Sequence, residues 1–129
     1  ILTFFDENTM INNIFYYGEH TVQFDYYFIL NKVIEDKDFG LILKPKNPRN
    51  FKKRLGNLLP LLNKALATNR CYLYLDYLQN QSSVTVAQAA LSADIVVCGK
   101  LDAGTAALES ALAGIKTCFV DCDNFITCV

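Results

Sequence analysis

Short apolar runs alternate with longer segments of helical periodicity along most of this chain of 129 residues. Each run is only a few residues long and is bounded by charged or turn-forming residues, a pattern typical of buried strands. These runs predict strands at residues 1–5, 40–44, 71–76, 95–98 and 116–120.

Helical periodicity is clearest over residues 20–37, where apolar side chains recur at the three- to four-residue spacing of one helix face. Two shorter helices are predicted at 86–91 and 105–113. Gly114 is placed to end the second of these, because glycine readily adopts the backbone conformation that closes a helix.

A further helical region follows the second predicted strand, from about Arg49 to Ala67. It contains Pro60, which would damage a helix interior but suits the first turn of a new helix. The region therefore predicts two helices, with a break near Asn57 and the second helix over 59–67.

The alternation of strands and helices predicts an α/β domain with a Rossmann-like parallel sheet of five or six strands and helices on both faces. The chain length fits a single domain, which we assign to residues 1–129. In such sheets ligands bind outside the carboxyl ends of the strands. Site residues are therefore expected in the loops that follow the strands.

The amino-acid composition narrows the range of possible functions. The net charge of −1 and the sequence pI of about 5.7 argue against a nucleic-acid-binding protein, which normally has a basic surface. The five cysteines form no C-x-x-C pair, so we expect buried thiols rather than disulfides or a zinc site. No apolar run is long enough to span a bilayer and no secretory signal is visible, which favours a cytoplasmic protein.

Residues 95–114 carry the most specific chemistry: a strand, a glycine-containing loop and a helix that opens with small residues. Gly104, Thr105 and Ala106 would leave backbone N–H groups accessible at the helix start, where the helix dipole also favours anions. Glu109 follows about one turn later, and its carboxylate suits the two hydroxyls of a ribose. A structural role fits equally, because an acidic residue near a helix start is favourable through the dipole alone.

The run GTAALE at 104–109, followed by Gly114, resembles the donor-binding segment of GT-B glycosyltransferases. It is similar to the segment in lipid A disaccharide synthase, in the peptidoglycan GlcNAc transferase and in surface-polysaccharide transferases. The resemblance implies that the chain is the C-terminal half of a GT-B fold and part of a longer enzyme. It also implies that residues 104–106 hold the donor diphosphate and that Glu109 meets the donor ribose.

A second, partial match is LILKPKNP at 41–48. Capsule and teichoic-acid type transferases often carry a strand followed by K-P-H-P here, and the histidine position corresponds to Lys46 or Asn47. Lys44 and Lys46 would neutralise a diphosphate as compact point charges. A solvated basic loop without a ligand is the alternative interpretation.

The resemblance implies transfer of a glycosyl group from a nucleotide-sugar to a surface-polysaccharide or glycolipid acceptor, with no bound metal and no cofactor apart from the donor. In such enzymes the general base and the acceptor site normally lie on an N-terminal domain that this chain lacks. We therefore expect these residues to bind nucleotide without turnover. Peripheral association of the full-length enzyme with the inner face of the membrane is compatible with such an acceptor.

Two other interpretations stay open. A sugar-nucleotide epimerase of the non-hydrolysing UDP-GlcNAc 2-epimerase type shares the architecture. A non-catalytic α/β module is the other, since Asp6-Glu7-Asn8 and Asp76 follow predicted strands as the Mg²⁺-binding carboxylates of receiver domains do. Against a receiver domain, Cys98-Gly99 stands where Ser or Thr is expected, and Val120-Asp121 is not followed by Lys-Pro.

Overall fold

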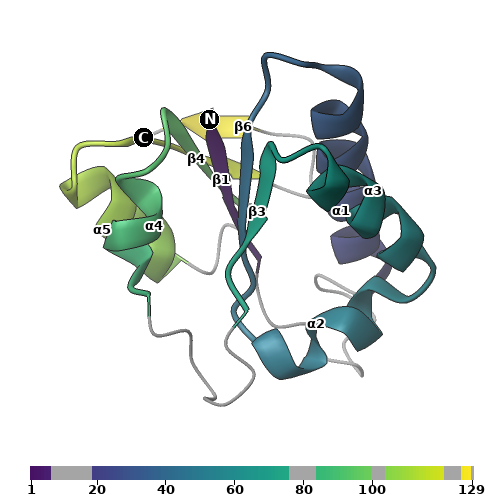
Figure 1. The fold of residues 1–129 in the computed structure, drawn as a ribbon. Coiled ribbons are helices and arrows are strands. Elements are labelled where there is room, and N and C mark those ends of the chain that lie inside the picture. The colour runs from purple at the N-terminus through teal and green to yellow at the C-terminus, as the bar shows by residue number, and fades with distance from the viewer. Residues whose placement is uncertain (7–18, 76–83, 100–103, 121–125, 129) are drawn as a thin grey trace.

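A computed structural model of the chain describes residues 1–6, 19–75, 84–99, 104–120 and 126–128. These residues form one sheet with helices packed on both of its faces (Figure 1). The α/β class and the layered, Rossmann-like arrangement expected from the sequence are therefore confirmed.

Six strands form the sheet: β1 (Leu2–Phe5), β2 (Leu41–Lys44), β3 (Cys71–Leu73), β4 (Ile95–Cys98), β5 (Lys116–Val120) and β6 (Ile126–Cys128). The first five pair in parallel, as predicted, but β6 runs antiparallel to β5. Only residues 121–125 separate these two strands, too few for the crossover that a parallel neighbour needs.

The strand order is β3-β2-β1-β4-β5-β6, so β1 lies between the two parts of the sheet. The chain winds outward from β1 in one direction to β3 and then in the other direction from β4. In sheets of this kind the ligand crevice lies at the carboxyl ends of the strands where the winding reverses, here between β1 and β4. Flavodoxin-like sheets, to which receiver domains belong, have the order 2-1-3-4-5, which differs from the order of this sheet.

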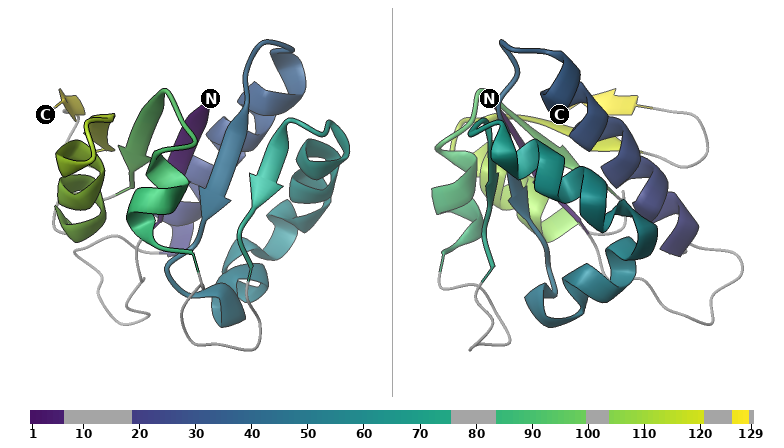
Figure 2. Two further views of the ribbon diagram at one scale, coloured as in Figure 1. Left: turned by 60° about the vertical axis from the view of Figure 1, so that its left-hand side comes forward. Right: turned by 45° about the vertical axis from the view of Figure 1, so that its right-hand side comes forward.

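Three helices cover the β1–β2–β3 part of the sheet on one face: α1 (Glu19–Glu35), α2 (Pro48–Leu55) and α3 (Leu59–Ala67) (Figure 2). The core on this side consists mainly of large side chains. Its fully buried members include Phe4, Val22, Tyr26, Leu30, Leu43, Phe51 and Leu55.

Two short helices, α4 (Val86–Ala90) and α5 (Gly104–Leu112), cover the opposite face. Successive strand residues point to opposite faces, so Phe4 belongs to the first core and Phe5 to the second. The second core is made mostly of small side chains: Ala89, Ala90, Val96, Cys98 and Ala107 surround Phe5.

Local signals explain the helix boundaries. Helix α2 begins at Pro48, just before the expected position, because the side chain of Asn47 caps it and accepts a hydrogen bond from the Asn50 N–H at 3.4 Å. A 3-10 turn over Gly56–Leu58 separates α2 from α3, as Pro60 predicted. Gly114 ends α5 with a φ of 83°, a conformation that glycine adopts without strain.

Candidate functional site

The carboxyl edge of the parallel strands brings together several polar residues from distant parts of the chain. Asp6 directly follows β1, Lys44 is the last residue of β2, and helix α2 begins just beyond it at the same edge (Figure 1). Helix α5 follows β4 after residues 100–103, so its N-terminus belongs to this edge as well. These elements flank the crevice expected between β1 and β4.

Among the described residues at this edge, Asp6 is the most buried ionisable group, with 2 % of its surface exposed. Its Oδ2 accepts a hydrogen bond from the Tyr26 hydroxyl at 2.9 Å and lies 3.0 Å from the guanidinium Nη2 of Arg54. Its Oδ1 accepts the backbone N–H of Lys46 at 2.6 Å. A buried carboxylate is stable only when its charge is paired and its oxygens are hydrogen-bonded, and both conditions hold here.

Lys44 points to the face of the sheet that α5 covers. It pairs in register with Phe5, which belongs to the core under α4 and α5, and it is half-buried. Desolvation by burial lowers the pKa of Lys44, while the charges of Asp6 and Glu109 act in the opposite direction. Both carboxylates therefore lie within electrostatic range of the Lys44 ammonium group.

Helix α5 starts at Gly104, as the sequence analysis expected to within one residue. Thr105 and Glu109 are exposed to solvent, and Gly104 and Ala106 are half-buried. A Cβ atom added to Gly104 would meet no atom within 4 Å, so the described residues leave the start of the helix open. The first N–H groups of such a helix are available to an anion.

The backbone and the side chain of Lys46 have different environments. Its backbone is held by Asp6, whereas its side chain is exposed. Of the six residues proposed from the sequence, Lys44 and Glu109 are linked electrostatically. The others lie at the same edge of the sheet: Gly104, Thr105, Ala106 and Lys46.

The sequence analysis did not identify Arg54 and Tyr26 as residues of this edge. A signal for Arg54 was present: it lies three residues after Phe51 and next to Leu55, so it falls on the buried face of α2. Only 7 % of its surface is exposed. A buried arginine needs an anionic partner, and Asp6 provides one.

The residues considered for a metal site differ in whether the structure describes them. Asp6 is occupied by Tyr26, Arg54 and the Lys46 backbone, and Glu7, Asn8 and Asp76 lie outside the described residues. Among the residues that the structure describes, no three His, Cys, Asp or Glu side chains are grouped so as to hold a metal ion. Likewise, within the described ranges no helix is long and apolar enough to cross a bilayer.

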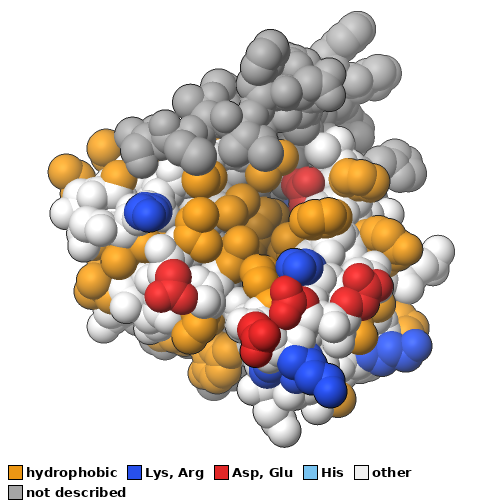
Figure 3. All heavy atoms as spheres, turned by 90° about the horizontal axis from the view of Figure 1, so that it is seen from above, with side chains coloured by type: hydrophobic (Ala, Val, Ile, Leu, Met, Phe, Trp, Pro, Cys, Tyr) orange, Lys and Arg blue, Asp and Glu red, His pale blue; other side chains and the backbone are white. Residues whose placement is uncertain are grey.

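The opposite end of the sheet is different in character. An open groove of about 670 Å³ lies there, lined by residues that include Phe39, Leu41, Arg70 and Tyr72. Figure 3 looks onto this end of the molecule, where hydrophobic side chains gather near the centre. Because ligands of doubly wound sheets bind at the carboxyl ends of the strands, this groove is not the expected site.

No protein-family model, curated protein or solved structure matches this chain. Function is therefore inferred from the geometry of the carboxyl edge and from the resemblance of segments 41–48 and 104–109 to donor-binding segments of GT-B glycosyltransferases.

Proposed function

We propose that this domain binds the nucleotide-sugar donor of a GT-B glycosyltransferase that acts in surface-polysaccharide or glycolipid biosynthesis. The observation that supports the proposal most is the electrostatic link between Lys44 and Glu109. These residues come from the two sequence segments that independently resemble donor-binding segments, and they are far apart in the chain.

In the proposed complex, the diphosphate of the donor binds at the N-terminus of α5, where N–H groups and the helix dipole favour an anion. The half-buried Lys44 adds one positive charge, which acts more strongly there than at the surface because little water screens it. The exposed carboxylate of Glu109 accepts hydrogen bonds from the ribose hydroxyls.

The proposed reaction transfers a glycosyl group from the donor to an acceptor hydroxyl, and the nucleoside diphosphate leaves. Helix N–H groups and Lys44 would stabilise the negative charge that develops on the leaving phosphate. The base that takes the acceptor proton belongs to the N-terminal domain of such enzymes. The domain described here should consequently bind nucleotide without turning it over.

The proposal is tested by titrating ¹⁵N-labelled protein separately with UDP, CDP and GDP. Saturable shift changes are expected in the amides of Lys44, Lys46, Asn47 and residues 104–109, with at least one of the three nucleotides. Lys44→Ala should weaken binding by roughly tenfold or more, the loss expected for a hydrogen bond to a charged group. Lys37→Ala, an exposed lysine near the opposite end of the sheet, is the control and should bind as the wild type does.

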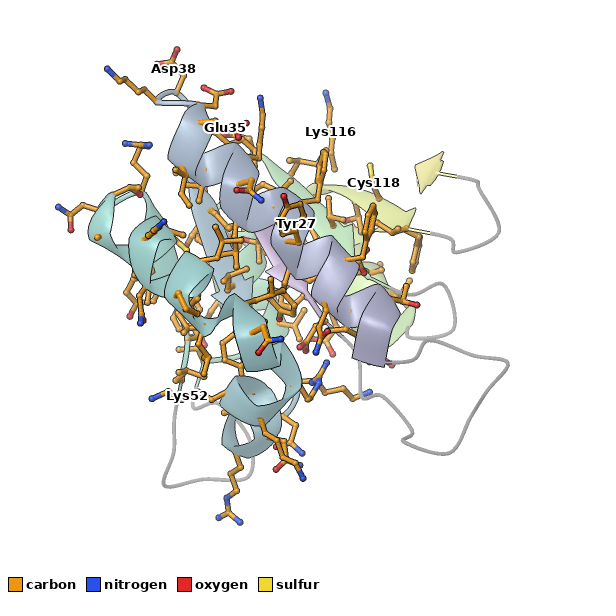
Figure 4. All side chains as sticks on the ribbon, turned by 90° about the vertical axis from the view of Figure 1, so that its right-hand side faces the viewer. Tyr27, Glu35, Asp38, Lys52, Lys116 and Cys118 are labelled. Atoms are coloured by element: carbon orange, nitrogen blue, oxygen red, sulfur yellow. The ribbon has the colours of Figure 1, made fainter. Side chains whose placement is uncertain are left out.

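Glu109→Gln separates the ribose contact from the phosphate contact. It should weaken binding of the nucleoside diphosphate but should not weaken binding of inorganic pyrophosphate, which has no ribose. The control is Glu35→Gln, because Glu35 is exposed and lies at the end of the molecule away from α2 (Figure 4). If none of the three nucleotides shifts the amides of 104–109, the proposed function is wrong.

A further inference from the structure

The connection between β2 and α2, which carries Lys46 of the proposed donor site and directly follows Lys44, is held by a hydrogen bond to the buried Asp6 carboxylate. Pro45 and Pro48 have fixed φ angles and no N–H group, so Lys46 and Asn47 supply the only backbone donors between the two elements. The Lys46 N–H donates to the Asp6 carboxylate at 2.6 Å. The Lys46 side chain is nevertheless exposed at this edge.

The Asp6 carboxylate that accepts this N–H is itself fixed from two helices. The Tyr26 hydroxyl of α1 and the Arg54 guanidinium of α2 both contact its Oδ2, at 2.9 and 3.0 Å. A second tie joins the same helices, because the side-chain amide of Gln23 donates to the backbone carbonyl of Arg54 at 3.0 Å. Asp6 therefore connects the end of β1 to α1, to α2 and to the backbone of Lys46.

We propose that Asp6 is a positioning residue of the donor site. Held by Tyr26 and Arg54, it fixes the backbone of Lys46 and so places the lysine-bearing connection against the donor phosphates. This inference rests on the proposed function and adds to it the group that orders the phosphate-binding connection before the donor arrives. A connection ordered in advance loses less conformational freedom on binding, so affinity is higher.

The test removes one contact of Asp6 and keeps the packing around it. Tyr26→Phe retains a ring that packs edge-on against Phe4 and Phe51, with centroids 5.4 Å away in each case, and deletes only the hydroxyl. The probe is whichever of UDP, CDP and GDP binds the wild type most tightly. Its affinity should fall by about two- to tenfold, the loss expected for one hydrogen bond.

Val33→Ala is the matched control, because Val33 lies in the same helix as Tyr26 and is fully buried. It should lower the midpoint of urea unfolding by creating a cavity, yet leave nucleotide affinity unchanged. Hydrogen exchange gives a readout that needs no ligand: the Lys46 amide should exchange slowly in the wild type and faster in Tyr26→Phe, but not faster in Val33→Ala.

The outcomes separate this inference from the proposed function. If the wild type binds nucleotide and Tyr26→Phe binds it equally well, Asp6 does not position the donor site and the proposed function stands. The inference is also overturned if the Lys46 amide of the wild type exchanges as fast as an exposed amide. If the wild type binds none of the three nucleotides, the proposed function fails, whatever Lys46 exchange reveals about the connection.

Discussion

The two faces of the sheet differ in the size of the side chains that bury them. On the α1–α3 side, the rings of Phe4, Tyr26 and Phe51 pack edge-on against one another in a core of large residues. On the α4–α5 side, Ala89 and Ala107 occupy comparable positions against the strands.

Because of this difference, one face fixes the carboxyl ends of the strands and the other provides access to them. The large-residue side contains the buried charge pair of Asp6 and Arg54, so it fixes the carboxyl ends of β1 and β2 through many contacts. On the small-residue side, the described residues leave the start of α5 open, and the half-buried Lys44 points to this face. Rigidity and access are thus provided by opposite faces that meet at one edge of the sheet.

The largest expected effect comes from breaking the charge pair on the large-residue side. Asp6→Asn keeps the shape of the side chain but leaves the Arg54 guanidinium buried without its anionic partner. The free energy of unfolding should fall by about 3–5 kcal/mol, measured by urea denaturation. Asp38→Asn, at an exposed aspartate, should change it by no more than about 0.5 kcal/mol. Equal losses in the two variants would contradict a structural role for the pair.

The reactivities of two cysteines allow strand β3 to be compared with strand β5. Burial raises the pKa of Cys71 in β3 from 9.0 to about 12, so its reactive thiolate is roughly a thousandfold scarcer at neutral pH. Cys118 in β5 is half-buried beside α1 on the α1–α3 side of the sheet (Figure 4). Iodoacetamide followed by peptide mapping should therefore modify Cys118 well before Cys71. The reverse order would mean that β3 opens more readily than β5.

Overpacking the small-residue side should cost an intermediate amount. Ala107 is buried against the sheet with 2 % of its surface exposed, so Ala107→Leu forces α5 outward. We expect a loss of about 1–3 kcal/mol in the free energy of unfolding, measured by thermal or urea denaturation. Ala67→Leu at the exposed end of α3 is the control and should have little effect. A neutral Ala107→Leu would show that α5 can move away from the sheet at little cost.

The smallest expected effect is the pH dependence due to Lys44. Because burial lowers its pKa below 10.5, the folded protein loses this proton before the unfolded chain does. Between the lowered pKa and 10.5 the unfolded chain binds more protons, so this group makes the free energy of unfolding rise with pH in that window. Lys44→Met should remove that contribution and reduce the slope, as measured by urea unfolding at a series of alkaline pH values. Lys37→Met, at an exposed site, should alter the slope less.

Much of the secondary structure could be predicted because its signals are local. The five parallel strands were found from short apolar runs, and the α2–α3 break was found from Pro60. Gly114 was correctly expected to end α5. The antiparallel β6 was not predicted as a strand.

The candidate site was predicted only where local sequence patterns indicated it. The strand–loop–helix pattern indicated residues 104–106 and Glu109, and the resemblance of segment 41–48 to donor-binding segments indicated Lys44 and Lys46. The network around Asp6 was not predicted, since Tyr26 and Lys46 lie 20 and 40 positions away from it. No local pattern specifies which distant donors will reach a carboxylate.

By itself, therefore, the sequence determined the helices and the five parallel strands and which residues stand at the ends of those strands, because these depend on neighbours within a few positions. The tertiary structure alone decided the strand order, which sets where a ligand crevice is expected, and it brought Lys44 within electrostatic range of Glu109. It also decided that Asp6 is a buried partner of Arg54 rather than an exposed carboxylate. The physical reason is that burial and charge pairing arise only when distant segments pack together and exclude water.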